Sequence, residues 1–195
     1  MAHLLSGDAK KYHERITREL SGRFRIVPLH ERVPPHLTLK IPFEADTEQI
    51  HDVEKVLRSF ARVRRSAPLI LKGFGRFGFK TIYLDVCKSD QAVSLSRECI
   101  NVLRENFPWL PNAPLEGNKL HASVARFLSR RQFLRMWKLL HGLSPSFNSS
   151  FDNITILKKE DSHWSVHTRI ALPEEHDLHD VELELRVARH KTLVS

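Results

Sequence analysis

The sequence lacks several features that would define a class of protein at once. None of its apolar runs approaches the ~18 residues that a membrane helix needs, and the segment from Met1 to Asp8 lacks the basic start and long apolar core of a secretory signal. Only two of the 195 residues are cysteines, Cys87 and Cys99, and no C-x-x-C pair occurs. We therefore expect a cytoplasmic protein without membrane insertion, in which the cysteines are small buried thiols rather than part of a disulfide framework or a zinc site.

Acidic residues are in deficit. Lys and Arg total 31 against 23 Asp and Glu, which gives a formal net charge of +8 and a pI near 9.8. A surplus of this kind favours a polyanionic partner such as RNA or a phosphorylated small molecule. The alternative, that the charge only keeps the protein soluble, stays open, because no basic tract is denser than Arg62, Arg64 and Arg65.

Helical and strand patterns alternate along the chain. Apolar spacing of three and four predicts helices, and alternation between Pro and Gly breaks predicts strands. The predicted helices cover residues 8–20, 47–63, 90–107 and 129–141, and the predicted strands cover 23–27, 36–43, 68–74, 81–86, 119–127, 151–157 and 164–172. The same order of elements occurs twice, which indicates an internal duplication. We predict an α+β fold of two similar lobes.

The charged end of the chain is set apart from this pattern. We expect a single bilobal domain over residues 1–172 and a tail over 173–195, whose apolar spacing fits a helix slightly better than a strand. The tail contains EEHDLHD at 174–180, which offers two histidines and four carboxylates to a metal. A solvated acidic turn is the favoured interpretation, and no metal site is expected.

Two short segments carry the same polar pattern. PPHLTLK at 34–40 contains His36 and Thr38, and HASVAR at 121–126 contains His121 and Ser123. Residues i and i+2 of a strand lie on one face about 6.5 to 7 Å apart, so each histidine points with its hydroxyl residue while the aliphatic neighbours point into the core. Two such strands facing each other would place two imidazoles and two hydroxyls around one small volume.

This doublet alone is a weak signal. HWS at 163–165 and HKT at 190–192 also match it, and a lone histidine in a strand is more often structural than catalytic. Only the first two doublets follow Pro-containing loops, hold a small or aliphatic residue between the polar pair, and occupy equivalent positions in the apparent duplication. These two are therefore the candidate site.

The stretches around these doublets resemble the two-histidine (2H) phosphoesterase superfamily, which includes bacterial 2'-5' RNA ligase-like proteins. The resemblance covers about residues 8–172 and rests on PPHLTL, on HASVAR with its histidine 85 residues further along, on LKGFGRFGFKTIYLDV between them, and on HWSVHTRIAL near the end. It implies two opposed antiparallel sheets with flanking helices and the histidines in a central cleft. The sequence departs from the pattern twice: residues 2–6 are the only candidate for the first strand, and Ser123 stands where threonine is also common.

The resemblance also implies a reaction. It points to a metal-independent phosphodiesterase, without a cofactor, that hydrolyses a 2',3'-cyclic phosphate or a 2'-5' linkage of RNA or a nucleotide. Opening such a ring needs a base that takes a proton from water and an acid that protonates the departing ribose oxygen, and two imidazoles can do both near neutral pH. The resemblance assigns His36 as the acid and His121 as the base. Thr38 and Ser123 would hold the non-bridging oxygens.

Three further residues are candidate substrate ligands. Lys40 shares the predicted face of His36 and Thr38, whereas Arg126 falls on the opposite face from its histidine if the strand is regular. Phe74, Phe77, Phe79 and Trp109 lie in loop-prone stretches where a ring could stack on a base, although core packing is the commoner role. Of these four, Phe79 is the candidate substrate ligand. Two other interpretations stay open: a non-catalytic protein that binds RNA or a nucleotide in the same cleft, and an RNA 2'-5' ligase that runs the reaction in reverse. We expect a monomer.

Overall fold

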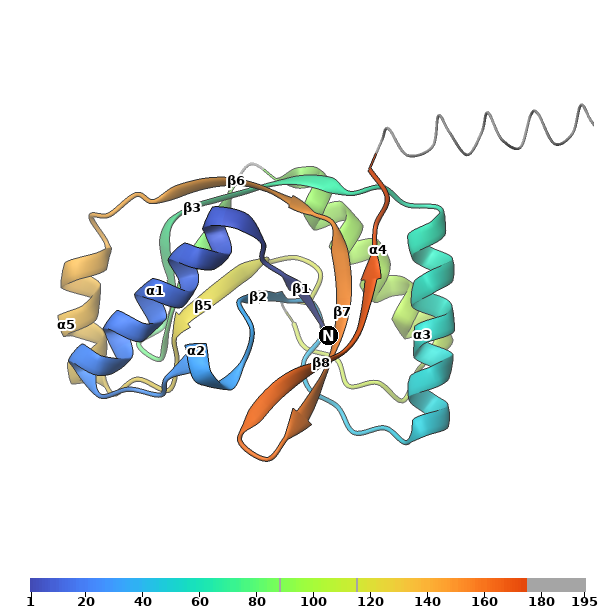
Figure 1. The fold of residues 1–195 in the computed structure, drawn as a ribbon, viewed down its shortest axis with the longest axis horizontal. Coiled ribbons are helices and arrows are strands. Elements are labelled where there is room, and N and C mark those ends of the chain that lie inside the picture. The colour runs from blue at the N-terminus through green and yellow to red at the C-terminus, as the bar shows by residue number, and fades with distance from the viewer. Residues whose placement is uncertain (88, 115, 175–195) are drawn as a thin grey trace, which may run out of the picture.

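The computed structural model describes residues 1–87, 89–114 and 116–174 of the chain (Figure 1). The strands of this part form two antiparallel sheets of four, with the orders β2-β1-β7-β8 and β5-β4-β3-β6. The first sheet contains β1 (Ala2–Leu4), β2 (His36–Thr38), β7 (Asn153–Glu160) and β8 (His163–Ala171), and the second contains β3 (Ala67–Phe77), β4 (Thr81–Cys87), β5 (His121–Ala125) and β6 (Ser146–Phe151). The predicted α+β class with two antiparallel sheets is confirmed. Predictions for the tail beyond Glu174 lie outside the described residues.

Helices flank the sheets at both ends of the molecule. Figure 1 shows α1, α2 and α5 at one end and α3 and α4 at the other. Their bounds are Gly7–Phe24 for α1, Leu29–Arg32 for α2, Thr47–Arg62 for α3, Asp90–Asn106 for α4 and Arg130–Leu140 for α5. The two doublet strands are held by their sheet neighbours, β2 by β1 and β5 by β4, and α1 also packs on β5.

Local sequence signals explain where two of these helices begin. The Asp46 side chain accepts a hydrogen bond from the backbone N–H of Gln49, whose own side chain accepts one from the Asp46 N–H, and Ser129 and Gln132 repeat this capping box at α5. Each box satisfies backbone donors that have no partner inside the helix and stabilises it by about 1 kcal/mol. A polar cap followed by an amphipathic run is therefore enough to start both helices.

The core is built from the alternating apolar residues of the strands. Leu37 and Leu39 around β2, and Leu69 and Leu71 on β3, have at most 1% of their surface exposed. Fully burying a side chain of this size stabilises the fold by about 1.5–3 kcal/mol. Because side chains alternate along a strand, this burial orients the polar residues between them toward the opposite face.

One predicted strand is wrong and another is too long. Residues 23–27 do not form a strand, because Leu20 and Phe24 continue the buried face of α1 and Arg25 ends the helix in a left-handed conformation at φ 51°. The strand predicted over 36–43 ends at Thr38. Lys40 therefore lies outside β2, and the alternation of side chains along a strand, from which its position was predicted, does not apply to it.

Two further features differ from the sequence expectations. The predicted strand at 151–157 is the end of β6 and the start of β7, and most of β6, with the sequence SFNSSF, was not predicted because Ser and Asn have low strand propensity. Cys99 is buried as expected, but Cys87 at the end of β4 is only half-buried.

Candidate active site

Two edge strands, one from each sheet, bring the two doublets together. β2 is an edge of the first sheet and β5 an edge of the second, and the two strands lie beside each other (Figure 1). His36 and Thr38 are half-buried on β2, and His121 and Ser123 are half-buried on β5. Because Leu37 between the first pair is fully buried, the polar side chains share the face away from the core.

The same backbone contact orients both imidazole rings. Nδ1–H of His36 donates to the carbonyl oxygen of Pro34 at 2.8 Å, and Nδ1–H of His121 donates to that of Lys119 at 3.1 Å. A carbonyl oxygen can only accept, so the contact assigns the hydrogen of each neutral ring to Nδ1 and leaves a lone pair on Nε2. The Thr38 hydroxyl donates to Nε2 of His36 at 3.3 Å. Each Nε2 is the atom that can exchange a proton with a substrate.

Burial and nearby cations favour a neutral His36. Burial lowers the pKa of His36 to about 4, and the hydrogen bond to the Pro34 carbonyl offsets part of this effect. The charges of His13 when protonated, of the Met1 amine and of Arg126 lower that pKa further. The ring is therefore in the form that accepts a proton at neutral pH.

His121 has a different set of neighbours. Burial lowers its pKa from the usual 6.5, and the hydrogen bond to the Lys119 carbonyl opposes this. The positive charges of Arg126 and Lys119 lower the pKa, while the Asp85 carboxylate raises it. Asp85 is the Cα partner of His121 in the β4–β5 pairing, and its carboxylate lies 2.5 Å from Nζ of Lys119. An imidazolium at position 121 therefore has an anionic neighbour.

Aromatic rings surround His121. Phe77 packs edge-on against the imidazole with centroids 4.7 Å apart, and Tyr83 lies 5.1 Å from it. Gly75 makes room for Tyr83, because a Cβ at this position would come within 2.3 Å of the ring. Phe79, the aromatic predicted to contact substrate, lies instead on the turn after β3 and is 43% exposed. The structure thus places Phe77, rather than Phe79, against the histidine.

A third histidine supports both doublets and was missed from the sequence. Nε2–H of His13 on α1 donates to the carbonyl oxygen of Ser123 at 2.9 Å. His13 is 3% exposed, and burial lowers its pKa to about 4. Its charge, when present, acts on His36. The signal was a polar residue on the same helical face as the buried Ile16 and Leu20.

Arg126 lies closer to the site than a regular strand would allow. Neighbouring residues of β4, Ile82 and Tyr83, pair with Ala125 and Ser123, so β5 contains one extra residue at a β-bulge. A bulge reverses the alternation of side chains beyond it. Arg126 is exposed, and its charge lowers the pKa of both site histidines. Arg126 was expected on the opposite face only if the strand was regular, and the bulge means that this condition is not met.

Lys40 is not available to a substrate. Its side chain is fully buried, with Nζ 2.8 Å from the Glu116 carboxylate and donating also to the Pro111 carbonyl oxygen. The second carboxylate oxygen of Glu116 accepts from the N–H of Ile41 at 2.9 Å. Lys40 thus joins the chain after β2 to the loop before β5, instead of sharing the face of the first doublet.

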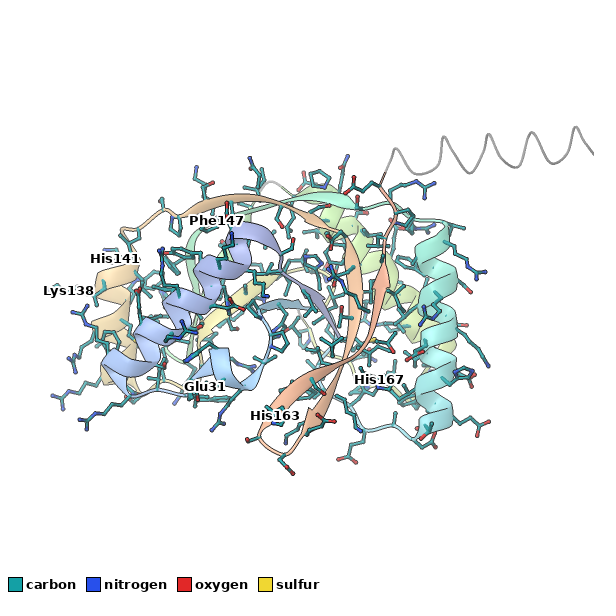
Figure 2. All side chains as sticks on the ribbon, in the orientation of Figure 1. Glu31, Lys138, His141, Phe147, His163 and His167 are labelled. Atoms are coloured by element: carbon teal, nitrogen blue, oxygen red, sulfur yellow. The ribbon has the colours of Figure 1, made fainter. Side chains whose placement is uncertain are left out.

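The other histidine doublets do not reach this site. His163 lies near the tip of the β7–β8 hairpin, 3.8 Å from Glu160, and His167 on β8 lies 3.3 Å from Glu54 of α3 (Figure 2). The doublet of His190 lies outside the described residues. A hollow of about 1000 Å³ between α3 and the β7–β8 hairpin is lined by His167 but by neither site histidine.

Neither a metal-binding cluster nor a membrane-spanning helix is present in residues 1–87, 89–114 and 116–174. Within these ranges no three His, Cys, Asp or Glu residues are grouped so that they could hold a metal ion. No helix in the same part of the chain is long and apolar enough to cross a membrane. Most of the acidic segment 174–180 is outside the described residues, so its role as an alternative metal site is untested.

The fold and the sequence define a two-histidine phosphoesterase. The sequence model of the 2'-5' RNA ligase superfamily matches residues 8–163, which is most of the chain, and the chain therefore belongs to this family. The structure also matches the crystal structure of TT0787 of Thermus thermophilus with a TM-score of 0.62 and 16% identity, over 90% of this chain and 97% of that one. At that identity the match supports the fold alone.

Bacterial relatives carry names of the same kind. The protein named "Putative phosphoesterase GK0864" from Geobacillus kaustophilus is 29% identical over 138 residues, which are 69% of this chain and 76% of that protein. A Bacillus pumilus protein also named as a phosphoesterase is 27% identical over 158 residues, which are 80% of this chain and 89% of that protein. The resemblance read from the two doublets is confirmed at the level of the superfamily.

Proposed function

We propose that this protein is a phosphodiesterase that opens a 2',3'-cyclic phosphate at the end of RNA or on a nucleotide, with His36 and His121 as its acid–base pair. The observation that carries the proposal is the matched orientation of the two rings. In both, Nδ1–H is held by the carbonyl oxygen two residues earlier, so both present Nε2 for proton transfer from neighbouring edge strands. His3 and His141 also hold Nδ1 on a backbone carbonyl, so the support lies in two matched rings on adjoining edge strands, each with a hydroxyl residue two places further along.

The reaction follows from these two nitrogens. One Nε2 takes a proton from water as the water oxygen bonds to phosphorus. The bond from phosphorus to one ribose oxygen breaks, and the other Nε2 gives that oxygen a proton, which leaves a phosphomonoester and a free hydroxyl. Thr38 and Ser123 donate hydrogen bonds to the non-bridging oxygens as negative charge develops. Arg126 adds positive charge beside both rings.

The charges around the rings favour one assignment of roles. Of the groups that lower the pKa of His36, Arg126 keeps its charge near neutral pH, because burial lowers the pKa of the Met1 amine to about 5 and that of His13 to about 4. The His36 pKa of about 4 makes the ring neutral before substrate binds. Burial, Arg126 and Lys119 lower the pKa of His121, but Asp85, its partner across the β4–β5 pairing, opposes them, and among the described groups that act on His36 there is no such carboxylate. We therefore assign His36 as the base and His121 as the acid, the reverse of the order implied by resemblance. In enzymes that use two titratable groups, the group with the lower pKa serves as the base and the group with the higher pKa as the acid, and this assignment follows that rule.

The test is turnover of a defined panel. Purified protein is incubated in EDTA with 2',3'-cyclic nucleotides, RNA ending in a 2',3'-cyclic phosphate, and 2'-5' oligoadenylate, and the products are identified by mass spectrometry. We expect the cyclic phosphates to give phosphomonoesters. If turnover is absent in EDTA and appears when a divalent ion is added, the reaction depends on a metal and the two-histidine mechanism is wrong. Tight binding without turnover would leave a binding protein.

A further inference from the structure

One region next to the site has unbalanced positive charge. Residues 117–151 contain six Lys and Arg and no Asp or Glu. Arg76 and Lys80, at the β3–β4 turn, and Arg126, Arg130 and Arg131, after β5, are all exposed. In the part of the chain that the structure describes, none of the five forms an ion pair with a carboxylate. Their charge is therefore available to a partner.

Exposed aromatic rings lie among these arginines. Phe127 is 73% exposed with the Arg126 guanidinium 5.1 Å from its centroid, and Phe79 is 43% exposed with that of Arg130 at 5.3 Å. The Leu128 N–H donates to the Lys80 carbonyl oxygen at 3.2 Å, which joins the two segments. We call Arg76, Phe79, Arg126, Phe127 and Arg130 the arginine–aromatic surface.

Phe127 has an unfavourable conformation that the fold does not explain. Its φ is 58°, in the left-handed region, where a residue with a bulky side chain is strained by about 1–3 kcal/mol. A ring that is 73% exposed recovers little of this through burial. Glycine would fit the backbone better. A phenylalanine here therefore points to a role for its ring outside the folded core.

The surface is continuous with the two-histidine site. Arg126 belongs to both, because its guanidinium lies over Phe127 and its charge acts on His36 and His121. On the other side, Phe77 contacts His121, and the turn that carries Phe79 follows directly. A polymer bound at the histidines would extend over this surface at the α5 end of the molecule (Figure 1).

We propose that the arginine–aromatic surface binds the nucleotides next to the scissile phosphate, so that the preferred substrate is a single-stranded RNA several nucleotides long rather than a mononucleotide. This inference rests on the proposed function. Arg76 and Arg130 pair with phosphates, and Phe79 and Phe127 stack on bases, an arrangement that is typical of sites for single strands. An acidic protein would also match the charge, but it would not explain why two exposed rings lie next to guanidinium groups.

The test compares two substrates that share the reacting group. One is a 2',3'-cyclic mononucleotide, and the other is an RNA of about six nucleotides, long enough to span a single-strand site, that ends in the same cyclic phosphate. Phe127→Gly removes one ring and should raise KM for the RNA by about 5–100-fold, since one stacked base is worth about 1–3 kcal/mol. The mononucleotide KM and kcat should change less than twofold. The Phe127→Gly protein should melt at or above the temperature of the parent, because the strain is released.

Charge is tested in the same assay. Arg130→Gln should weaken RNA binding and reduce the slope of log affinity against log salt by about 0.7, the value for one phosphate contact with a single strand. Arg62→Gln is the matched control, because Arg62 is exposed at the end of α3, on the opposite side of the molecule. Phe127→Trp should keep the RNA preference.

The outcomes separate this inference from the proposed function. If Phe127→Gly affects both substrates equally, or affects neither, the arginine–aromatic surface does not bind the RNA. The proposed hydrolysis of the cyclic phosphate would still hold. If the parent turns over neither substrate, fluorescence anisotropy with labelled RNA still tests the surface. In that assay, weaker binding by Phe127→Gly and Arg130→Gln than by Arg62→Gln supports the surface. Equal binding by all three variants overturns it, as it would if the partner were an acidic protein.

Discussion

The two halves of the site share one kind of backbone hydrogen bond but differ in the residues that surround it. The rings of His36 and His121 are each held by the carbonyl oxygen two residues earlier. The lasting charge that acts on His36 is that of Arg126, whereas His121 has two aromatic rings, the cations Arg126 and Lys119, and the Asp85 carboxylate beside it. The repeated motif thus fixes which ring nitrogen is bound to the backbone. In the proposed mechanism, the neighbours, which are not repeated, separate the acid from the base.

The largest effect is expected from removing either ring. His36→Ala and His121→Ala should each lower kcat on a cyclic phosphate by about 10²–10⁴-fold, and the double variant should lose little more because both act on one transition state. The comparison is sharpened with a p-nitrophenyl phosphodiester, whose leaving group needs no proton. The acid variant, His121→Ala, should recover on this substrate, while His36→Ala should not.

Control variants locate this effect. His163→Ala, at the exposed tip of β7–β8, should leave both activities within twofold of the parent. Recovery of His36→Ala in place of His121→Ala on the activated substrate would reverse the assignment of acid and base. Near-normal turnover of the cyclic phosphate by either variant would remove that ring from the mechanism.

The next largest effect concerns the contact that joins the two half-sites. Glu116→Gln leaves the fully buried ammonium of Lys40 without its carboxylate, and breaking a buried pair in this way costs about 3–5 kcal/mol of unfolding free energy. Urea unfolding measures the loss. The paired replacement Lys40→Met with Glu116→Leu should recover most of the stability, because an apolar pair of similar volume needs no desolvation. A Glu116→Gln protein as stable as the parent would contradict the account.

Smaller losses are expected at the hydroxyls. Thr38→Val and Ser123→Ala each remove one donor to the phosphate and should lower kcat by about 5–150-fold, the equivalent of about 1–3 kcal/mol. The two losses should be similar, since the hydroxyls occupy equivalent places in the halves. Neither should change the shape of the pH profile, because a hydroxyl does not titrate in this range. Steady-state kinetics across pH decides both points.

The smallest effect is a shift in pH dependence. The base must be neutral and the acid protonated, so kcat/KM should rise as pH increases through the His36 pKa of about 4 and fall as it passes the His121 pKa, which lies below 6.5. Asp85→Asn removes an anion beside His121, lowers that pKa and moves the falling limb to lower pH. Arg126→Gln removes a cation beside both rings and moves both limbs to higher pH.

Folding must be checked across the same range. Burial lowers the pKa of His13 to about 4, so the unfolded chain binds the proton more readily. Folding with a neutral His13 therefore costs nothing above about pH 6.5, the pKa of an unperturbed histidine. Below that pH the protein loses stability progressively until the pH reaches about 4. Circular dichroism at each pH separates unfolding from titration of the site. If Asp85→Asn stays folded and the falling limb of the pH profile of kcat/KM does not move, His121 is not the titrating acid.

The sequence predicted the parts of the site that depend on local pattern. Alternation of polar and aliphatic residues placed His36 with Thr38 and His121 with Ser123, and this alternation persists because Leu37 and Ala122 are fully buried. Helix caps and apolar spacing placed most helices. These signals act over a few residues, so they can be read without the tertiary structure.

The remaining features depend on long-range contacts. Lys40 is buried because of Glu116, 76 residues away, and no local pattern reveals such a partner. Arg126 turns toward the site because of a bulge that shows only in the pairing of β5 with β4. His13 becomes part of the site through a carbonyl group 110 residues further along. Each of these errors came from extending a local rule beyond the element in which it holds.

The order of the strands along the chain affects when each sheet can form during synthesis. All four strands of the second sheet lie between residues 67 and 151, whereas the first sheet combines β1 and β2 with β7 and β8, which end at residue 171. A nascent chain can therefore complete the second sheet first, while β1 waits for its partner β7. Distant pairing of this kind is slow and leaves apolar strands open to aggregation. The first sheet, which carries His36, therefore needs strands from both ends of the described chain before it is complete.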